Sequence, residues 1–473
     1  MTAAEGTAHA GAPPAQDPRR VRVLAILGSS ADILTLSTQL LQVCREDLAE
    51  LIHADNEVRT WLRRDRLRRE CEALFDEVDD EEISADERAA LAALAAAAVE
   101  LAPVTIARTI AEALDATLGS RLLPMFLNRA VTLAQDDPIP TPHPDWRTLT
   151  PSPNSDPWAL DGRLDALPHL RLAGDWARSV RVTLDGDWRT WHAFPQLGPG
   201  DRVACAMPNE HFDELTFSRA TEHGRPVFGD MRVVLPDDEQ RDRCLALLDR
   251  AAAQGCRIVV FPELSVPKPV LEEMARWLDR QRAVELIVAG SRHRKARDGR
   301  WHNESQILFR GWRQRRRHRK FRPFSFVDTD GRTRAVRIED IAVTRPQLRV
   351  YLTPSWTAAV LICKDVVQEP APRMLGDLRA NLVMVPALSF KLDAFRAVAG
   401  DIASWGQGIA LIANAGFGPR RRAPRVGLVM AVPSQHGSVH EVVPPGRSLA
   451  VATIGDSSKN ATVEWLGERP DEG

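Results

Sequence analysis

Lysine is almost absent from this 473-residue chain, which holds six lysines against 56 arginines. No lysine precedes Lys268, and this excludes the phosphate-binding loop that ends in Gly-Lys-Ser/Thr from the first half of the chain. Because arginine replaces lysine almost everywhere, a lysine kept inside an arginine-rich run invites a chemical explanation. Lys320, in Arg-His-Arg-Lys-Phe, is such a residue, and arginine cannot imitate its compact ammonium in a tight site.

Paired cysteines and long apolar runs are also missing. The spacing of the cysteines argues against a disulfide scaffold or a zinc motif and suits a reducing cytoplasm; they are Cys44, Cys71, Cys205, Cys244, Cys256 and Cys363. No stretch is long and apolar enough for a transmembrane helix. The net charge of −2 gives the whole chain no general affinity for polyanions. We therefore expect a cytoplasmic protein.

One segment near the start needs separate treatment. Arg19-Arg20 before Val21–Leu27 faintly resembles a twin-arginine signal, but Gly28 and Asp32 interrupt the apolar run and no convincing cleavage site follows. We predict that Val21–Leu27 is a strand. A strand, a turn and a helix here could hold a phosphate at the helix N-terminus, but a plain strand–turn–helix is favoured.

Three residues in chain order suggest a chemistry: Glu263 in Val-Val-Phe-Pro-Glu, Lys320, and Cys363 in Val-Leu-Ile-Cys-Lys-Asp. A carboxylate, an amine and a thiol are what cysteine-based hydrolysis of amides or nitriles needs, because a thiol is already partly ionised near neutral pH. Taken singly, each has an ordinary alternative: a charge at a helix N-terminus, a solvated cation and a small buried apolar residue. The prediction depends on their conjunction.

Short apolar segments alternate with amphipathic ones around these three residues. The expected strands are Arg202–Met207, Arg257–Phe261, Leu286–Ala289, Ala358–Ile362, Asn381–Pro386, Ile409–Ala413, Val426–Pro433 and Leu449–Ile454, with helices over 238–254 and 270–278. This alternation predicts an α/β domain built in layers. Ligand sites in such sheets gather at the carboxyl ends of strands, where Glu263 and Cys363 both stand.

Further motifs accompany the three residues: Gly290-Ser291, Asn303 in Trp-His-Asn-Glu-Ser, Asp365 in Cys-x-Asp, and Asn414 in Ala-Asn-Ala-Gly. Together they resemble the carbon–nitrogen hydrolase (nitrilase) superfamily over about residues 200–460. The resemblance implies a four-layer αββα sandwich, often dimeric, with no cofactor and no metal.

The resemblance also assigns roles. Cys363 is the nucleophile, and Lys320 with the backbone N–H of Lys364 stabilises the oxyanion. Glu263 is the general base, and a carboxyl group in an apolar pocket has the raised pKa that this work needs. The residues expected to line the substrate pocket are Asn303, Asp365 and Asn414.

The resemblance has two departures near the site. Members of the family often carry a second Glu shortly after the Lys, and none follows Lys320; Asp328 or Glu339 could serve instead. Lys364 stands where the family often has an aromatic residue. About twenty residues also separate Arg202–Met207 from the next apolar segment, Met231–Leu235. These departures leave open an unusual substrate or a site that has lost its activity.

The first 200 residues carry no recognisable catalytic or metal-binding set. We predict a disordered tail at 1–18, a mostly helical accessory domain at 19–136, a Pro-rich linker at 137–157, a β-hairpin or connector at 158–200 and the hydrolase domain at 201–465. Helices are expected over 33–51, 56–75, 85–100 and about 104–118, the third opening with a capping box from Ser84 to Glu87. Val180–Leu184 and Trp188–Phe194 suggest the hairpin, turning at Asp185-Gly186.

The leading functional hypothesis is a cysteine-dependent hydrolase of non-peptide carbon–nitrogen bonds, more an amidase than a nitrilase, acting through a thioester on Cys363. One alternative is a catalytically inactive nitrilase-like protein used for binding or assembly. Another is the hydrolase component of a bacterial defence-type system.

Partners follow from the same hypotheses. They are a small-molecule amide or nitrile substrate, with an anionic substrate as one option, a second copy in a homo-oligomer, and a protein bound through the helical domain, but no membrane. The basic run Arg310–Arg322 is a solvated face or recruits an anionic substrate or partner, and nucleic acid is less favoured because no aromatic stacking platform accompanies it.

Overall fold

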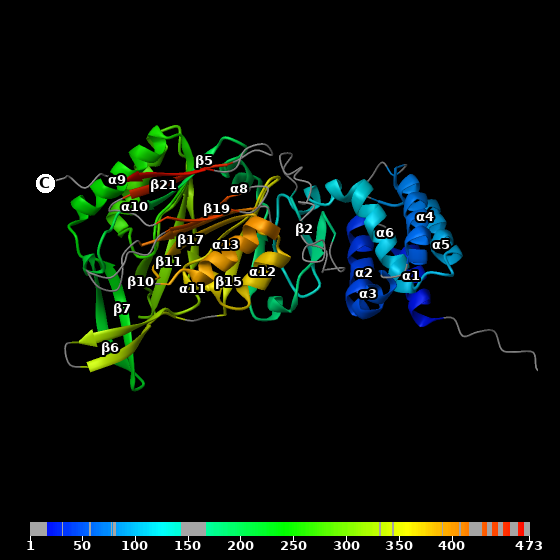
Figure 1. The fold of residues 1–473 in the computed structure, drawn as a ribbon, viewed down its shortest axis with the longest axis horizontal. Coiled ribbons are helices and arrows are strands. Elements are labelled where there is room, and N and C mark those ends of the chain that lie inside the picture. Colours follow the sequence, from blue (N-terminus) through cyan, green and yellow to red (C-terminus); the bar gives the residue numbers. More distant parts are fainter. Residues whose placement is uncertain are drawn as a thin grey trace, which may run out of the picture. The chain divides into compact units, whose positions relative to one another are not determined.

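The computed structural model describes residues 17–30, 32–55, 58–76, 78, 82–142, 167–330, 333–342, 345–389, 391–405, 408–415, 428–432, 438–442, 448–454 and 462–467. The chain divides into two compact units, one of Met1–Leu122 with Asp161–Leu172 and one of Leu123–Leu160 with Ala173–Gly473 (Figure 1). None of the helices in the described ranges is both long and apolar enough to cross a membrane.

The first unit is mostly helical. It contains α1 (Pro18–Ser29), α2 (Ile33–Glu46), α3 (Leu48–Asp55), α4 (Val58–Phe75), α5 (Ala85–Ala97), α6 (Pro103–Leu118), η1 (Gly119–Arg121) and β3 (Leu170–Leu172). The capping box is present, because the Ser84 hydroxyl accepts from the Glu87 N–H and the Glu87 carboxylate accepts from the Ser84 N–H. The predicted tail lies outside the described residues except for Asp17 and Pro18.

The strand predicted at Val21–Leu27 is wrong, because these residues belong to α1. The side chain of Asp17 accepts a hydrogen bond from the Arg19 N–H, and Pro18 occupies the first helical turn, so the chain carries a complete helix start. The buried residues Val23, Ile26 and Leu27 repeat at helical rather than alternating spacing.

The second unit is built on two eight-stranded sheets. The first sheet has the order β1 (Ala130–Thr132), β4 (Arg181–Asp185), β15 (Gln347–Leu352), β16 (Thr357–Val360), β17 (Leu382–Ala387), β18 (Ile409–Asn414), β19 (Leu428–Val432), β20 (Ser438–Val442). The second has the order β10 (Arg292–Lys295), β11 (Trp301–Phe309), β9 (Leu286–Val288), β8 (Cys256–Val260), β5 (Arg202–Met207), β21 (Ser448–Thr453), β22 (Thr462–Gly467), with β12 (Trp312–Arg319) paired to β11.

The two sheets share one apolar core. Side chains from β5, β8, β9 and β11 meet side chains from β16, β17 and β18 in a single buried cluster, with Trp356 fully enclosed. The central strands of each sheet run parallel to one another, and their residues are buried on both faces, as parallel strands require.

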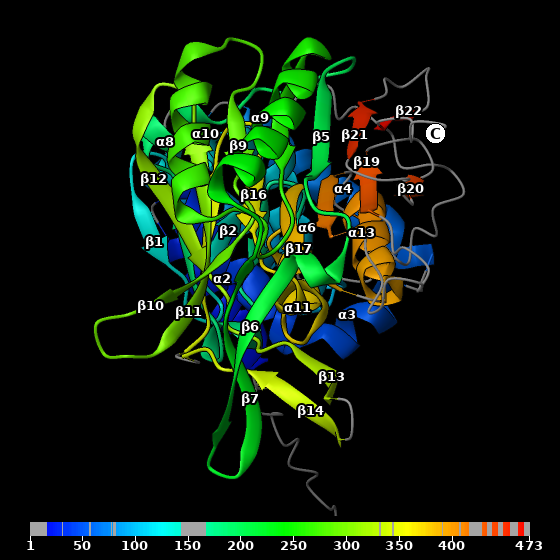
Figure 2. The same ribbon diagram turned by 90° about the vertical axis from the view of Figure 1, so that its left-hand side faces the viewer.

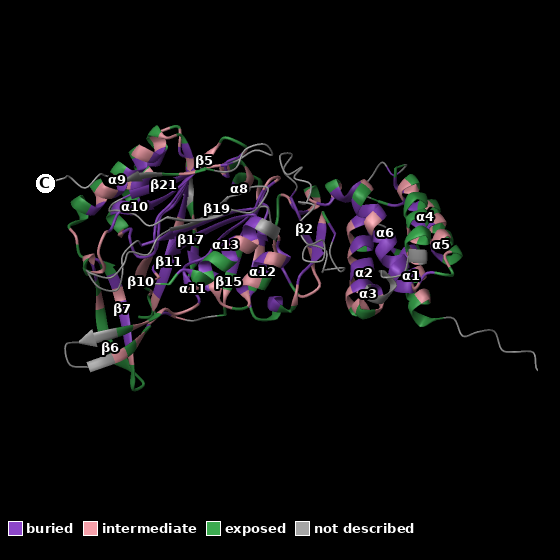
Figure 3. Cartoon of the chain, in the orientation of Figure 1, coloured by how far each residue is buried: buried purple, intermediate pink, exposed green. Residues whose placement is uncertain are grey.

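Helices flank both sheets, so the mixed α/β class is as predicted (Figures 1 and 3). On one side, α9 (Asp237–Ala253) and α10 (Lys268–Arg280) bury their apolar faces against β5, β8, β9 and β21. On the other, α13 (Asp393–Trp405) packs on β18 and β19, beside α11 (Lys364–Val367) and α12 (Ala371–Asp377). The remaining short elements of this unit are η2 (Pro124–Phe126), β2 (Pro138–Pro140), η4 (Asp175–Arg178), α8 (Trp188–Ala193) and η5 (Phe212–Glu214).

The hairpin predicted at 180–194 is wrong. Its first half is β4, which pairs in parallel with β15 and antiparallel with β1, but its second half is the helix α8. Asp187 starts that helix, because its side chain accepts from the Arg189 N–H. This connector therefore extends the edge of a main sheet. Of the predicted linker, residues 143–157 lie outside the described ones.

The roughly twenty unplaced residues before Met231 form one strand and most of a second strand of a third sheet. It has four strands in the order β13 (Ser325–Asp330), β14 (Thr333–Glu339), β7 (Arg225–Val233), β6 (Leu215–Glu222), and it projects from the main body in Figure 2. Phe228 and Met231 of this sheet share a buried cluster with Leu264 and Leu388, which lie in the loops beyond β8 and β17. The third sheet therefore packs against the loops at the strand ends.

Candidate active site

Glu263 follows β8 across Phe261-Pro262, and only 2 % of the residue is exposed. Its loop packs tightly on Gly290, just beyond β9, where φ is +51° and a Cβ atom would stand 2.3 Å from the Pro262 carbonyl oxygen. The neighbouring Ser291 hydroxyl accepts a hydrogen bond from the Leu264 N–H at 3.2 Å. The Gly290-Ser291 pair noted in the sequence therefore fixes the loop that carries Glu263.

The end of β17 holds two of the predicted residues through its backbone. The Cys363 N–H donates to the carbonyl oxygen of Pro386 at 2.9 Å, and the Glu263 N–H donates to that of Ala387 at 3.3 Å. The Cys363 thiol donates to the next carbonyl oxygen, on Leu388, at 3.7 Å. Three consecutive carbonyl groups thus bring together a thiol from one main sheet and a carboxylate from the other.

Lys320 is a fully buried cation between two carboxylates. Its Nζ donates to Glu263 Oε1 and to Glu339 Oε2, both at 2.7 Å. Burial acts to lower the pKa of Lys320, but the charges of Glu263 and Glu339 outweigh it and raise the pKa above its usual range. Lys320 therefore remains an ammonium ion.

Of the two proposed second acids, Glu339 reaches the site. It ends β14, and its Oε2 also accepts from the Phe324 N–H at 2.8 Å. Burial acts to raise the pKa of Glu339, but the Lys320 ammonium and the hydrogen bond from His293 hold it well below its usual range. Asp328 lies on β13, and its side chain is outside the described part of the structure.

Two further side chains complete the cluster. Asn303 on β11 donates from Nδ2 to Oε1 of both Glu263 and Glu339 at 2.8 Å, so it bridges the acids. His293 on β10 accepts from the Met231 N–H at Nδ1, which places its proton on Nε2, 2.9 Å from Glu339 Oε1. Sequence reasoning missed His293; the only signal was its position three residues after Gly290.

The hydrogen bonds give the two acids different characters. Glu263 Oε2 has no hydrogen-bond partner among the described oxygen and nitrogen atoms, whereas both oxygens of Glu339 are occupied. Burial raises the pKa of Glu263; the Lys320 charge opposes the rise and the Glu339 charge adds to it. Of the two acids, Glu263 is therefore the one that takes up a proton more readily, while Glu339 stays ionised.

Cys363 sits where β16 has ended and α11 is about to begin, with φ +48° and ψ −110°. A non-glycine residue in this region is strained, and such strain concentrates at functional sites. Burial and the Glu263 charge raise the pKa of the Cys363 thiol well above its usual value. The Lys320 charge opposes this rise without cancelling it, so the thiol is protonated in the resting site rather than partly ionised as expected. A base must remove the proton, and Glu263 is within hydrogen-bonding reach of the thiol.

Lys364 and Asp365 begin α11 directly after Cys363. The Lys364 N–H belongs to the first helical turn, whose N–H groups lack intrahelical acceptors. The Asp365 carboxylate accepts from the N–H groups of Phe321 and Arg322 at 3.1 and 2.8 Å and contacts His318 Nε2 at 3.1 Å. Asp365 therefore fastens the backbone just beyond Lys320 to the residues just beyond Cys363.

Asn414 likewise holds backbone. Its Oδ1 accepts from the Ser389 N–H at 2.7 Å, and its Nδ2 donates to the Ser389 carbonyl oxygen at 2.9 Å. This fixes the loop that contains Leu388, the acceptor of the Cys363 thiol. Asn303, Asp365 and Asn414 are thus placed to position other groups, and none of them lines the cavity of about 960 Å³ beside the cluster.

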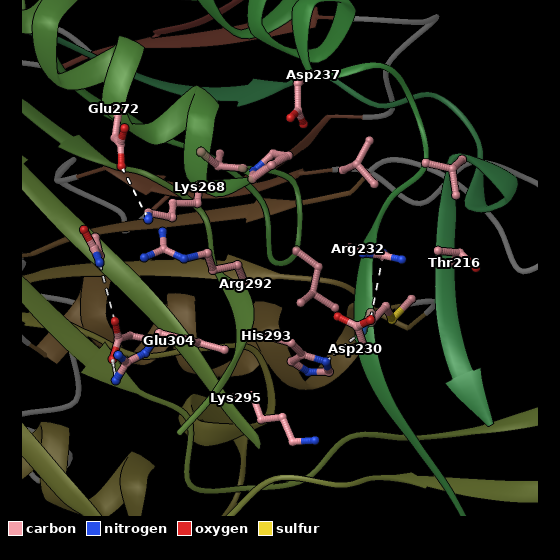
Figure 4. A pocket seen from close by; sticks show the side chains of 18 of the residues that line it. Thr216, Asp230, Arg232, Asp237, Lys268, Glu272, Arg292, His293, Lys295 and Glu304 are labelled. Atoms are coloured by element: carbon pink, nitrogen blue, oxygen red, sulfur yellow. Dashed lines mark hydrogen bonds and ion pairs between the residues drawn. The ribbon is translucent and has the colours of Figure 1, made fainter. Parts of the chain in front are cut away.

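A cavity of about 960 Å³ adjoins the cluster (Figure 4). It reaches the cluster through His293 and Leu264, whereas Glu263, Lys320 and Cys363 do not line it. Within the described residues, no group of three or more His, Cys, Asp or Glu side chains is arranged to hold a metal ion.

Comparisons with solved structures find nitrilase-superfamily amidases. An amidase from Nesterenkonia sp. is 15% identical, with a TM-score of 0.37, and the match covers 55% of this chain and 92% of that one. Nit3 from Saccharomyces cerevisiae, a member of branch 10 of the nitrilase superfamily, is 13% identical, with a TM-score of 0.35 and coverages of 55% and 92%. No family model and no curated protein matches the sequence. Because the sequence identities and TM-scores are this low, the function has to be inferred from the geometry of the site itself.

Proposed function

We propose that this chain is a cysteine-dependent hydrolase of non-peptide carbon–nitrogen bonds, with amides preferred to nitriles. The observation that supports this most is the strained Cys363 thiol next to a buried carboxylate, Glu263, whose Oε2 is free to take its proton. The two core-sharing sheets with helices on both outer sides also agree with the αββα sandwich that the family resemblance implies.

Acylation would begin with transfer of the thiol proton to Glu263 Oε2. The Cys363 sulfur then forms a bond to the amide carbon, and the carbonyl π electrons move onto oxygen. The Lys320 ammonium and the Lys364 N–H are the donors for that oxyanion. When the intermediate collapses, the C–N bond breaks and the amine leaves with the proton that Glu263 returns to it. A thioester remains on Cys363.

Deacylation would use the same carboxylate. Glu263 takes a proton from water, the oxygen of that water forms a bond to the thioester carbon, and the C–S bond breaks as Glu263 reprotonates the sulfur. The products are a carboxylic acid and an amine or ammonia. A nitrile would first give a thioimidate. One water would convert the thioimidate to the thioester with release of ammonia, and a second water would cleave the thioester, so the site would have to activate two waters instead of one.

Glu339 has a different role in this scheme. Four donors bind Glu339, and Lys320 and Asn303 are two of them. Glu339 therefore holds both side chains next to Glu263 and keeps the Lys320 ammonium in place when Glu263 becomes protonated. We assign Glu339 as a positioning residue. The lack of a second Glu soon after Lys320 was one of two grounds for the inactive-protein alternative, the other being the long accessory half, and a carboxylate from β14 answers the first.

The test is direct capture of the thioester. The full chain is incubated with short aliphatic amides and the matching nitriles, ammonia release is measured, and quenched samples are digested and analysed by mass spectrometry. We expect ammonia release with amides and an acyl adduct on the peptide that contains Cys363. Cys363→Ala should abolish both, whereas Cys71→Ala, which removes a buried thiol of the helical unit, should change neither.

An opposite result is equally informative. If a folded chain releases no ammonia from any amide or nitrile and Cys363 carries no adduct, the hydrolase proposal fails. A binding or assembly role would then account for the site. Adduct formation on Cys363 without release would instead show that acylation works and that the water step lacks a component.

A further inference from the structure

The cavity beside the catalytic cluster has an unusual charge. Seven lysine and arginine side chains line it against four carboxylates, Asp230, Asp237, Glu272 and Glu304. Its volume of about 960 Å³ is within the range of small-molecule sites, which runs from about 300 to 1,000 Å³. A cavity of this size and charge favours a small anionic ligand.

One wall of the cavity belongs to a larger cationic face, formed by side chains that alternate along β10, β11 and β12. Arg292 on β10 and Arg319 on β12 are both paired in register with Glu304 on β11, so the three side chains share one face. Glu304 is buried; it accepts a hydrogen bond from Arg319 at 3.3 Å and forms ion pairs with Arg294 and Arg317 at 3.7 Å. One carboxylate therefore pairs with three guanidinium groups, so this cationic face keeps an excess of positive charge.

Arg292 has no carboxylate within ion-pair distance in the described part of the chain. Within the described part of the chain its guanidinium makes no ion pair and no hydrogen bond, although the residue is half-buried. Burial lowers its pKa, and although Glu304 opposes this, the charges of Arg294 and Arg315 lower it further. Arg315 also has no ion pair among the described residues. A half-buried arginine repelled by two others indicates an absent anionic partner.

The opposite wall supplies further donors. Figure 4 shows Lys268, the first residue of α10, pointing toward Arg292 across the cavity. Lys268 is only weakly paired, with Glu272 at 4.0 Å. The first turn of α10 carries no acidic residue, and its N-cap, Pro267, makes no side-chain hydrogen bond to it. The helix therefore directs the positive end of its dipole to the same place as the two cations.

We propose that this cavity is a binding site for a small polyanion, such as a phosphate ester or a diphosphate, held by Arg292, Arg315 and Lys268. The site is separate from the reaction centre, because Cys363, Glu263 and Lys320 do not line the cavity. It therefore does not depend on the proposed hydrolase function. His293 lies on its wall and also donates to Glu339, so the two sites share one side chain.

The experiment measures pyrophosphate binding to the full chain by isothermal titration calorimetry in low-salt buffer, with inorganic phosphate as the weaker comparison. We expect pyrophosphate to bind more tightly than phosphate, because two phosphoryl groups can meet cations on both walls. Arg292→Gln should weaken pyrophosphate binding at least tenfold, and Arg292→Gln with Arg315→Gln should weaken it further. Cys363→Ala should bind as the wild type does, which separates this site from the catalytic one.

Arg319→Gln is the matched control. Arg319 shares the face and contacts Glu304, but it does not line the cavity, so its replacement should change pyrophosphate affinity less than twofold. Thermal denaturation checks folding: pyrophosphate should raise the Tm of the wild type and leave that of Arg292→Gln unchanged. The proposal is overturned if pyrophosphate does not bind, if Arg292→Gln binds it equally well, or if Arg319→Gln weakens it as much. Binding of a single-stranded oligonucleotide in the absence of pyrophosphate binding would overturn it in favour of nucleic acid.

Discussion

The two faces of strands β10, β11 and β12 can be compared residue by residue. His293, Asn303 and Lys320 belong to the catalytic cluster, and the residue beside each of them, Arg292, Glu304 or Arg319, belongs to the cationic face. On the first face, one ammonium sits between two carboxylates, and donors occupy most of their oxygens. On the second, three arginines share one carboxylate, and Arg292 has no partner among the described residues.

The difference shows what burial demands. Where water is excluded, an unpaired charge costs several kcal/mol, so the catalytic face is nearly neutral and densely hydrogen-bonded. Where solvent reaches the cations, water and salt screen part of their mutual repulsion, so an excess of positive charge is tolerated there until an anion binds. A reaction centre and a ligand-recruiting surface can therefore occupy the two sides of the same three strands.

The largest contrast should come from removing adjacent cations. Lys320→Met leaves Glu263 and Glu339 buried without their shared ammonium, and we expect it to abolish turnover and to lower the free energy of unfolding by about 3–5 kcal/mol. Arg319→Met removes a partly exposed cation from the other face and should cost no more than about 1 kcal/mol. Urea denaturation followed by tryptophan fluorescence measures both, and equal losses would contradict the comparison.

The next contrast concerns carboxylates on the two faces. Glu339→Gln should lower kcat/KM roughly 10²-fold, because Lys320 and Asn303 lose their anchor. The Glu339 charge helps to raise the Glu263 pKa, so its removal lowers that pKa and keeps Glu263 in its basic form at lower pH. The acidic limb of the kcat/KM profile should therefore move to lower pH. Glu304→Gln is the control, and a shift of the same size there would contradict the assignment.

A smaller effect is expected at Asp365, which joins the backbone just beyond Lys320 to the residues just beyond Cys363. Asp365→Asn keeps the shape but weakens the acceptor for the N–H groups of Phe321 and Arg322, so Lys320 is held less firmly. We expect kcat to fall about tenfold with KM nearly unchanged, and stability to fall by about 1–2 kcal/mol. Steady-state kinetics and urea denaturation provide the two measurements. A change confined to KM would mean that Asp365 contacts substrate instead.

Salt should give the smallest effect and the cleanest separation. Raising NaCl from about 0.1 to 1 M shortens the Debye length from about 10 to 3 Å, which screens exposed charges and barely affects buried ones. Pyrophosphate affinity should fall at least tenfold over this range, while kcat/KM for a neutral amide should change less than twofold. An equal salt dependence of both quantities would show that the catalytic cluster is as solvated as the cationic face.

Sequence reasoning succeeded where a local pattern decides the structure. The strands before Glu263 and Cys363 and the helices α9 and α10 follow from apolar periodicity. It failed at Val21–Leu27, where a short apolar run fits either period and the Asp17 cap decides for a helix. It failed again at Trp188–Phe194, where a second strand was expected after a turn at Asp185-Gly186. Asp187 caps a helix there, and the residues that follow form α8 instead of a strand.

The site shows a second limit. Glu339 was only one of two weak candidates because it reaches Lys320 through the β13–β14 hairpin, and distance along the chain says little about that closure. His293 and the carbonyl groups of Pro386, Ala387 and Leu388 carried even less signal, since a backbone acceptor has no residue type. Such contacts are fixed by tertiary packing alone.

The shared core between the two main sheets has a consequence for how substitutions far from the site affect turnover. Glu263 is carried by one sheet and Cys363 by the other, so the thickness of the apolar layer sets the gap that the proton must cross. A substitution such as Met384→Ala, buried in that layer and remote in sequence from both residues, would let the sheets settle closer or slide. The cavity would lower the melting temperature, and the shift of the sheets would lower turnover further than the loss of folded protein explains.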